Sequence, residues 1–468
     1  MATSSPARRR SWWDHVTGIA ERGRDVLNGV PGRRHNLAEL CSQLLVQRGE
    51  ASGLALATEI VDRLRQLDGS DRDHFLELLA RDFGIDAARV QSAVDAWRRE
   101  PQDPDAQLAL FRAVEAPRQE LFRRLNVAPG ATSELVALRG RLLSLLRDHP
   151  QLRPVEDDLH HLLSSWFNRG FLQLQAIDWR SPALLLEKLI TYETVHEIKG
   201  WDDLRGRLAA DRRCFAFFHP ALPDEPLVFL EVALVVGLPG QIRPLLDPDR
   251  EIGDSLRATT AVFYSINNTQ RGLRGIWFGN FLIKQVVAEL SDELPNIKTF
   301  VTLSPLPRLA ACLLNTDGNG GFTESRLRAV IGDDMEELVR ATGLSEPRAA
   351  VDALLASPGA RSDSLRRLAQ RVVLAYLTQV RVGDRVLDPV AHFHLSNGAR
   401  LERINLDADR SEKGLEESRG VMVNYLYDPA RLELSHERYV GEGVVTTSRE
   451  LAGELSRIRA IWERGRQG

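Results

Sequence analysis

Apolar residues recur with a helical period through the first third of the chain. From residue 36 to about 168 no strand-like run interrupts this period, and proline or glycine marks several helix ends. These residues are therefore expected to form an all-helical domain. The predicted helices cover residues 36–48, 51–67, 71–83, 86–99, 104–126, 132–148 and 152–167.

Near residue 170 the pattern changes, because short β-branched and aromatic runs begin to alternate with helical stretches. Residues 214–219 and 227–234 flank a turn rich in proline and aspartate, which predicts a β-hairpin. This mixture indicates an α+β domain over residues 169–468 with a helical insert. Further helices are expected over 181–192, 199–210, 308–380 and 448–464, and further strands over 390–395, 400–405 and 421–427.

The second part of the chain is organised around one strand–turn–helix–strand sequence. Residues 259–266 predict a buried strand, residues 281–290 a helix that packs on a sheet, and residues 298–304 a second strand. This order is typical of a βαβ unit, in which the two strands are parallel.

The turn of this unit combines glycines 272, 275 and 279 with Arg271 and Arg274. Glycine lets the backbone approach a ligand, and a helix start favours anions, so the turn suits a pyrophosphate. An ordinary glycine-rich turn is the alternative, since both the Gly-Lys-Ser/Thr end and the Gly-x-Gly-x-x-Gly spacing of common nucleotide loops are missing. The segment resembles the acyl-CoA pyrophosphate loop of the N-acetyltransferase superfamily, although Trp277 stands where that pattern usually has glycine. The candidate CoA-binding residues are Arg274, Gly275, Ile276, Trp277, Phe278, Gly279 and Asn280.

Composition adds few constraints to this picture. The formal net charge of −4 gives no general attraction to nucleic acid or membrane, and no apolar run is long enough to span a bilayer. Three scattered cysteines argue against a disulfide framework or a zinc site and favour a reducing compartment. We expect a cytoplasmic protein whose first 35 residues form a flexible basic segment, with a weak targeting signal as the alternative for that segment.

Two further stretches contain candidate residues for chemistry. His392 and His394 lie in a run that reads as a strand, where both rings would share one face. A histidine packed against a sheet is the simpler interpretation, and a metal site is disfavoured because no further ligands accompany the pair. Ser304 ends the strand after the glycine turn, although Ser304-Pro305 could equally be an ordinary helix cap.

Taken together, four stretches resemble the malonyl-CoA decarboxylase family. Their order and spacing agree with that family over residues 170–440, and the helical first part also fits. The stretches contain Phe218-His219-Pro220 through Leu227, Phe263-Tyr264-Ser265-Ile266 through Lys284, Leu303-Ser304-Pro305-Leu306-Pro307, and Asp388-Pro389-Val390-Ala391 through Ala399 with Asn424-Tyr425 downstream.

The resemblance implies conversion of malonyl-CoA to acetyl-CoA and CO2 on an N-acetyltransferase-like fold, without a metal or prosthetic group. It places the catalytic serine at Ser304, the catalytic histidine at His394 and the CoA pyrophosphate segment at Arg274–Asn280. It also implies that the helical domain forms a homo-oligomer. Two alternatives stay open: an acyl-CoA-dependent N-acyltransferase, and a CoA-binding regulator without catalytic activity.

Overall fold

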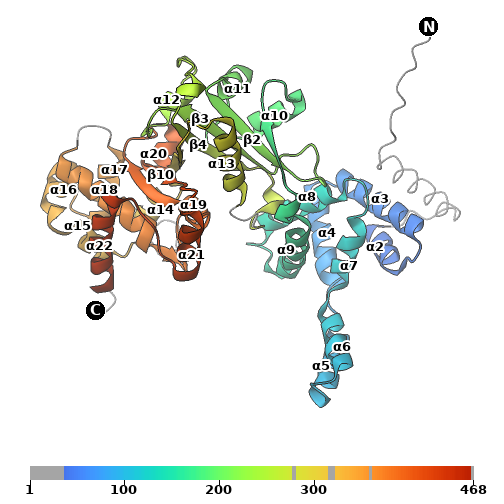
Figure 1. Ribbon diagram of the computed structural model, residues 1–468. Helices are drawn as coiled ribbons and strands as arrows, with labels where there is room; N and C mark the ends of the chain where they lie inside the picture. Colours follow the sequence, from blue (N-terminus) through green and yellow to red (C-terminus); the bar gives the residue numbers. More distant parts are fainter. Residues whose placement is uncertain (1–35, 277–280, 315–321, 358–360, 465–468) are drawn as a thin grey trace, which may run out of the picture. The chain divides into compact units, whose positions relative to one another are not determined.

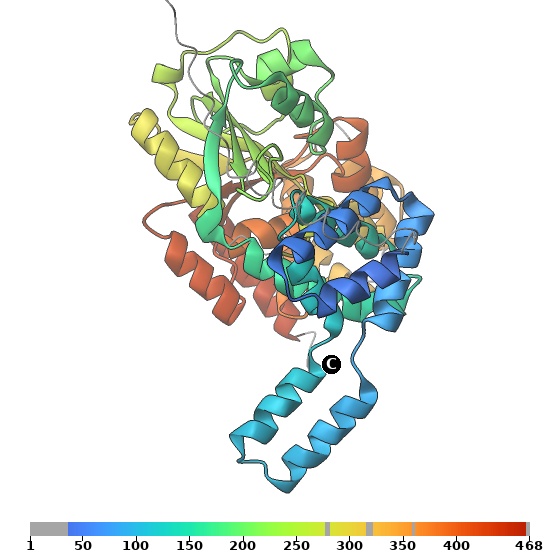
Figure 2. The ribbon, with the colours of Figure 1, turned by 90° about the vertical axis from the view of Figure 1, so that its right-hand side faces the viewer.

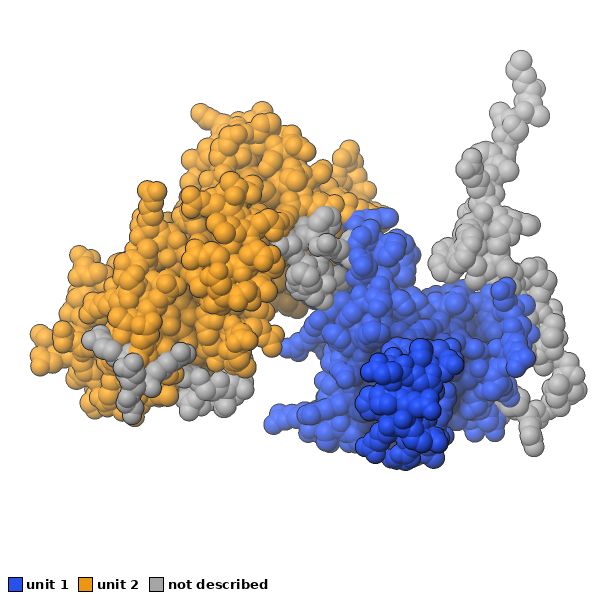
Figure 3. All heavy atoms as spheres, turned by 60° about the horizontal axis from the view of Figure 1, so that its bottom comes forward, with its two compact units in different colours: residues 1–173, 218–227, 268–278 blue, residues 174–217, 228–267, 279–468 orange. Residues whose placement is uncertain are grey.

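The computed structural model describes residues 36–276, 281–314, 322–357 and 361–464 (Figure 1). The chain divides into two compact units, which Figure 3 colours separately. The first unit comprises residues up to 173 together with 218–227 and 268–278, and the second comprises the rest. None of the helices in the described ranges has the length and apolar character needed to cross a membrane.

The first unit is helical, as the sequence predicts, and buries a core of leucine and phenylalanine side chains. One expectation is wrong, because residues 104–126 form two helices and not one. Pro117 occupies the first position of the second helix, and Ala116 before it is extended, since proline disfavours a helical residue on its N-terminal side. The helices are α2 (Leu37–Val46), α3 (Glu50–Gln66), α4 (Gly69–Asp82), α5 (Ala87–Arg99), α6 (Pro104–Val114), α7 (Pro117–Leu125), α8 (Ala131–Leu145) and α9 (Arg153–Trp166).

Helices α5 and α6 form a hairpin that extends from the other helices of the first unit (Figure 2). Asp86 caps α5 and Asp103 caps α6, each accepting hydrogen bonds from two backbone N–H groups. These caps explain why two well-defined helices form although only Ala93, Ala106 and Ala113 are buried along them.

The second unit is built on a mixed sheet of eight strands in the order β1-β2-β3-β4-β5-β10-β6, with β9 paired to β10. The predicted hairpin is present, because β2 and β3 pair antiparallel. The predicted βαβ unit is also present, because β4 and β5 pair parallel. The strands are β1 (Gln173–Ile177), β2 (Arg212–Phe218), β3 (Val228–Val235), β4 (Thr260–Asn268), β5 (Thr299–Thr302), β6 (Ser304–Pro305), β9 (Arg400–Asn405) and β10 (Met422–Leu426).

Strand β10 lies between β5 and β9 and pairs antiparallel with both. A parallel pair joined by a helix, with an antiparallel strand beside it, agrees with the mixed sheet around one βαβ unit that the sequence predicts. One face of this sheet buries Val262, Tyr264, Val301 and Met422 in a common apolar cluster. Helix α13 (Phe281–Glu293) connects β4 and β5.

The insert over residues 308–380 is helical where it is described, but the segment over 390–395 is a helix and not the expected strand. Asp388 caps this helix and Pro389 occupies its first turn. These two residues are a local signal for a helix start, but the apolar run that follows them led to the prediction of a strand. The charged stretch around Glu412 also contains a helix. The helices of the second unit after β5 are α14 (Leu309–Leu314), α15 (Glu324–Ile331), α16 (Met335–Thr342), α17 (Pro347–Ala356), α18 (Asp363–Gln379), α19 (Pro389–Ser396), α20 (Glu412–Ser418), α21 (Leu432–Glu442) and α22 (Arg449–Arg464); before it lie α10 (Ala183–Tyr192), α11 (Trp201–Arg207) and α12 (Arg243–Leu246).

Gly398 connects α19 to β9 in a conformation that only glycine adopts easily, with φ of 83°. A Cβ at this position would lie 2.3 Å from the carbonyl oxygen of Leu432. We therefore expect Gly398→Ala to lower the free energy of unfolding by about 1–3 kcal/mol, measured by urea denaturation. Gly441→Ala in α21 is the matched control, because a Cβ there meets nothing within 4 Å. Equal stability of the two variants would contradict this account.

Candidate active site

The register of β10 places four side chains on one face of the sheet. Ser304 lies opposite Val423, and the same antiparallel register continues to Leu426 opposite Val301. Directly opposed residues share a face and alternate residues along a strand return to it. Thr302, Ser304, Tyr425 and Tyr427 therefore project from the same face.

Helix α19 brings His394 to this face. The side chain of Asp388 accepts hydrogen bonds from the backbone N–H groups of Val390 (3.0 Å) and Ala391 (2.9 Å), and from the Tyr376 hydroxyl (2.8 Å). Burial raises the pKa of Asp388, and these three donors satisfy the buried carboxyl group. The start of α19 is thereby fixed six residues before the histidine.

Ser304 and His394 contact each other. The distance between Ser304 Oγ and His394 Nε2 is 3.0 Å, and the Ser304 hydroxyl donates to Thr302 Oγ1 at 2.9 Å. On the other side of the ring, His394 Nδ1 lies 2.7 Å from the Tyr427 hydroxyl. The Tyr425 ring stacks on the imidazole, with centroids 4.7 Å apart and an interplanar angle of 26°. The imidazole is therefore held at both nitrogens and on one ring face.

The imidazole is neutral in this environment. His394 is 2 % exposed, and burial lowers its pKa from 6.5 to about 3. Because Ser304 donates to Thr302, it is free to accept from Nε2, which makes Nε2 the protonated nitrogen. The Tyr427 hydroxyl then donates to Nδ1, so Tyr427, His394 and Ser304 each donate one proton in the direction of Thr302, which accepts the last.

The sequence analysis proposed Ser304 and His394, and the structure places them together, but it missed Thr302 and Tyr427. Neither of these residues has a local motif, because their role depends on the pairing of β5 with β10. Simple helix capping by Ser304 is wrong, since this residue lies in β6 and the next helix starts at Leu309. Asn424 and Tyr425 are fully buried.

The shared-face prediction for His392 and His394 fails because α19 is a helix. Residues two positions apart on a helix point about 200° apart, and His392 Nδ1 instead lies 2.9 Å from the Tyr439 hydroxyl. In the described ranges, histidine, cysteine, aspartate and glutamate form no group of three or more that could hold a metal ion. The three cysteines are free and buried.

Part of the glycine-rich segment belongs to the first unit, where its start is fixed by close packing. A Cβ on Gly272 would lie 1.8 Å from the carbonyl oxygen of Val136 in α8, so the backbones touch. Gly275 has φ of 83° and, like Arg274, is exposed, whereas Ile276 is buried. The candidate residues Trp277, Phe278, Gly279 and Asn280 lie outside the described residues.

Arg139 of α8 connects this segment to the helical unit. Its Nη1 atom donates to the carbonyl oxygens of Gly272 (2.6 Å) and Arg274 (3.0 Å). Its Nη2 atom is 2.6 Å from Glu156 Oε1 in α9, and the Arg139 side chain is only 2 % exposed. A buried, paired guanidinium therefore holds two consecutive turns of the segment in place. No sequence signal distinguished this arginine from the others in the helical domain.

Comparison with known proteins identifies the family of this chain. The family model described as the malonyl-CoA decarboxylase C-terminal domain matches residues 170–464, and that described as the N-terminal domain matches residues 83–167. The chain belongs to the malonyl-CoA decarboxylase family. This is a family of enzymes, so the regulator alternative loses its support.

Among malonyl-CoA decarboxylases, the mitochondrial protein of Anser anser anser is 33 % identical over 421 residues, covering 86 % of this chain and 84 % of the goose protein. The mitochondrial protein of Rattus norvegicus is 32 % identical over 410 residues, covering 84 % of this chain and 83 % of the rat protein.

Solved structures of malonyl-CoA decarboxylases share the fold. The Rhodopseudomonas palustris crystal structure has a TM-score of 0.79 and 47 % identity, covering 89 % of this chain and 98 % of its own. The Agrobacterium vitis structure has a TM-score of 0.76 and 46 % identity, covering 90 % of this chain and 99 % of the Agrobacterium vitis chain.

Burial of His394 makes stability depend on pH. Between its usual pKa of 6.5 and its folded value of about 3, only the unfolded chain binds a proton at this histidine, so stability falls as pH falls. We expect this one group to lower the free energy of unfolding by about 2 kcal/mol between about pH 6.5 and about pH 5. Urea denaturation at both pH values should show a smaller decrease in His394→Gln. An equal decrease in the variant would mean that the histidine is not buried in its neutral form.

Proposed function

We propose that the chain decarboxylates malonyl-CoA to acetyl-CoA and CO2, with Ser304 and His394 as its catalytic residues. The observation that carries the assignment of these residues is the buried contact between the serine hydroxyl and the neutral imidazole at 3.0 Å. Family membership supports the reaction, and this contact supports the two residues.

Loss of CO2 breaks the bond between the carboxylate carbon and the α-carbon and leaves its electron pair on the α-carbon. The thioester carbonyl delocalises that pair as an enolate, so a donor directed at the carbonyl oxygen lowers the barrier, typically by about 10²–10³ in rate. Burial favours the reaction as well, because the carboxylate charge is poorly solvated and departs as neutral CO2. The reaction then needs one proton at the α-carbon.

His394 supplies that proton in our proposal. Its low pKa describes the site without substrate, and the negative malonyl carboxylate would favour the protonated imidazole. After CO2 leaves, the imidazolium gives its Nε2 proton to the α-carbon and returns to the neutral form. Tyr427 at Nδ1 and the stacked Tyr425 act as positioning residues, because they hold the ring in one orientation.

Ser304 orients the malonyl group by a hydrogen bond in our proposal. Its hydroxyl can turn from Thr302 toward the malonyl carboxylate or the thioester oxygen, and Thr302 Oγ1 fixes its resting position at 2.9 Å. The serine remains a hydrogen-bonding residue throughout and forms no covalent bond. The overall proposal uses no metal or prosthetic group.

For the coenzyme, we propose that the segment beginning at Arg274 binds the diphosphate. The exposed guanidinium of Arg274 and the left-handed Gly275 provide a cation beside open backbone. Arg139 is a positioning residue for this segment, because it binds the carbonyl oxygens of Gly272 and Arg274 from behind. The helical unit would then support substrate binding in addition to the oligomerisation expected from the resemblance.

Release of labelled CO2 from malonyl-CoA tests the reaction and the histidine together. The wild type should release CO2 without any amine acceptor and equally with a chelator, which separates it from an N-acyltransferase. His394→Gln should reduce kcat by about 10²–10⁴, the usual contribution of a positioned proton donor. CoA binding, measured by calorimetry, should remain.

His392→Gln is the matched control, since this half-buried histidine lies on the same helix but contacts Tyr439. It should retain turnover near that of the wild type. Full turnover by His394→Gln would refute the histidine assignment, whereas failure of the wild type to release CO2 would refute the reaction.

The role of the coenzyme segment is tested by measuring how variants change KM and kcat for malonyl-CoA. Arg274→Glu should raise KM for malonyl-CoA at least tenfold with a smaller effect on kcat, because a phosphate contact is present before and during the reaction. Arg139→Gln should also raise KM, because it removes the hydrogen bonds that hold the carbonyl oxygens of Gly272 and Arg274. Arg257→Glu, at an exposed arginine of another turn, controls for general charge. An unchanged KM in Arg274→Glu would exclude its phosphate role.

A further inference from the structure

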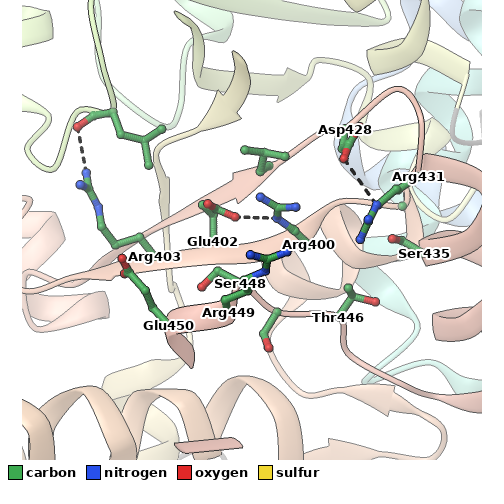
Figure 4. Close-up of a pocket in the computed structure, with 14 residues that line it drawn as sticks. Arg400, Glu402, Arg403, Asp428, Arg431, Ser435, Thr446, Ser448, Arg449 and Glu450 are labelled. Carbon is green, nitrogen blue, oxygen red and sulfur yellow. Dashed lines mark hydrogen bonds and ion pairs between the residues drawn. The ribbon is translucent and has the colours of Figure 1, made fainter. Parts of the chain in front are cut away.

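A cavity opens in the second unit, away from Ser304 and His394. It has a volume of about 590 Å³ and lies beside β9, the end of β10 and the start of α22 (Figure 4). Leu426 lines the cavity and lies opposite Arg400, whereas Tyr425, which stacks on His394, lies opposite Leu401. Because neighbours on a strand alternate, the cavity and the candidate catalytic pair occupy opposite faces of the β9–β10 pair.

The wall of this cavity holds a partly buried cation, Arg403, whose side chain donates hydrogen bonds to neutral acceptors. Arg403 donates from Nε to Asn424 Oδ1 (3.2 Å) and from Nη2 to the carbonyl oxygen of Leu238 (3.0 Å), and both acceptors are neutral. The carboxylates of Glu450 and Glu402, which also line the cavity, act on this charge electrostatically. Burial lowers the pKa of Arg403, which means that the charge has lost water. An anion in the cavity would compensate it.

Two hydroxyl groups line the same cavity without a partner. Ser448 Oγ and Thr446 Oγ1 are buried and make no hydrogen bond, and Ser448 is only 8 % exposed. The segment pairs with β9 through Leu401, opposite Thr447, so Thr446 and Ser448 point to the face that carries Arg400. Buried hydroxyls normally have a hydrogen-bond partner. The lack of a partner for these two indicates a position where a ligand could accept hydrogen bonds from them.

Two other arginines of the lining have carboxylate partners of their own. Arg400 pairs with Glu402 at 2.6 Å, and Arg431 is 4.0 Å from Asp428 (Figure 4). At the mouth, the exposed Arg449 and Glu450 contribute opposite charges at the start of α22.

We propose that this cavity is a second ligand site that binds a small phosphate monoester. A phosphate group can accept from the guanidinium of Arg403 and from the two hydroxyls at once, and the start of the 16-residue helix α22 adds favourable electrostatics. The volume is much larger than a bare phosphate ion requires and lies in the range of small-molecule sites, which favours an attached organic group. This inference stands independently of the proposed decarboxylation.

Calorimetry on the full chain tests the site, with inorganic phosphate and glycerol 3-phosphate as probes and chloride and glycerol as blanks at constant ionic strength. We expect saturable binding to one site that is unchanged by saturating CoA. Tighter binding of glycerol 3-phosphate would identify an organic phosphate, and equal binding would identify free phosphate. Absence of saturable binding for both probes, or competitive displacement by CoA, would overturn the proposal.

Variants of the lining residues connect the binding to the cavity. Arg403→Gln should weaken phosphate binding at least tenfold, and Ser448→Ala should weaken it by a smaller factor with the fold intact. Arg449→Gln at the mouth should also weaken it, whereas Arg459→Gln, an exposed arginine on the same helix outside the cavity, should bind like the wild type. If Arg403→Gln does not fold, Ser448→Ala and Arg449→Gln decide the question. Equal affinity in these variants and in Arg459→Gln would refute the site.

Discussion

The antiparallel register of β10 is the constraint on which the second unit depends. It places Ser304 opposite Val423 on one side and Leu401 opposite Tyr425 on the other. A slip of one residue would turn every side chain of the strand to the other face of the sheet. The catalytic candidates and the cavity lined by Arg403 would then exchange their surroundings, so the pairing of the five-residue strand β10 determines the position of both.

Burial gives the candidate active site its chemical character. Burial strongly disfavours the charged form of His394, while both of its ring nitrogens have hydrogen-bond partners. A histidine in this state can become protonated when an anion replaces solvent beside it, because the anion supplies the charge that burial removes. The same principle applies on the other face, where burial lowers the pKa of Arg403.

Sequence patterns anticipated much of the fold and part of the site. The βαβ unit, the hairpin and β9 were predictable, because each follows from local periodicity and turn residues. The apolar run containing His394 was wrong as a strand, since Asp388 and Pro389 start a helix there. Ser304 and His394 were named through the family resemblance, because no spacing rule joins residues so far apart.

The sequence alone determined the helical first part, the mixed sheet of the second and the family, because local patterns and motifs carry that information. Only the tertiary structure decided that Tyr427, His394, Ser304 and Thr302 form one hydrogen-bonded series, and that Arg139 supports the glycine-rich segment. Such contacts join elements that are remote along the chain. They depend on strand register and helix packing, which arise from the whole chain and which local periodicity does not specify.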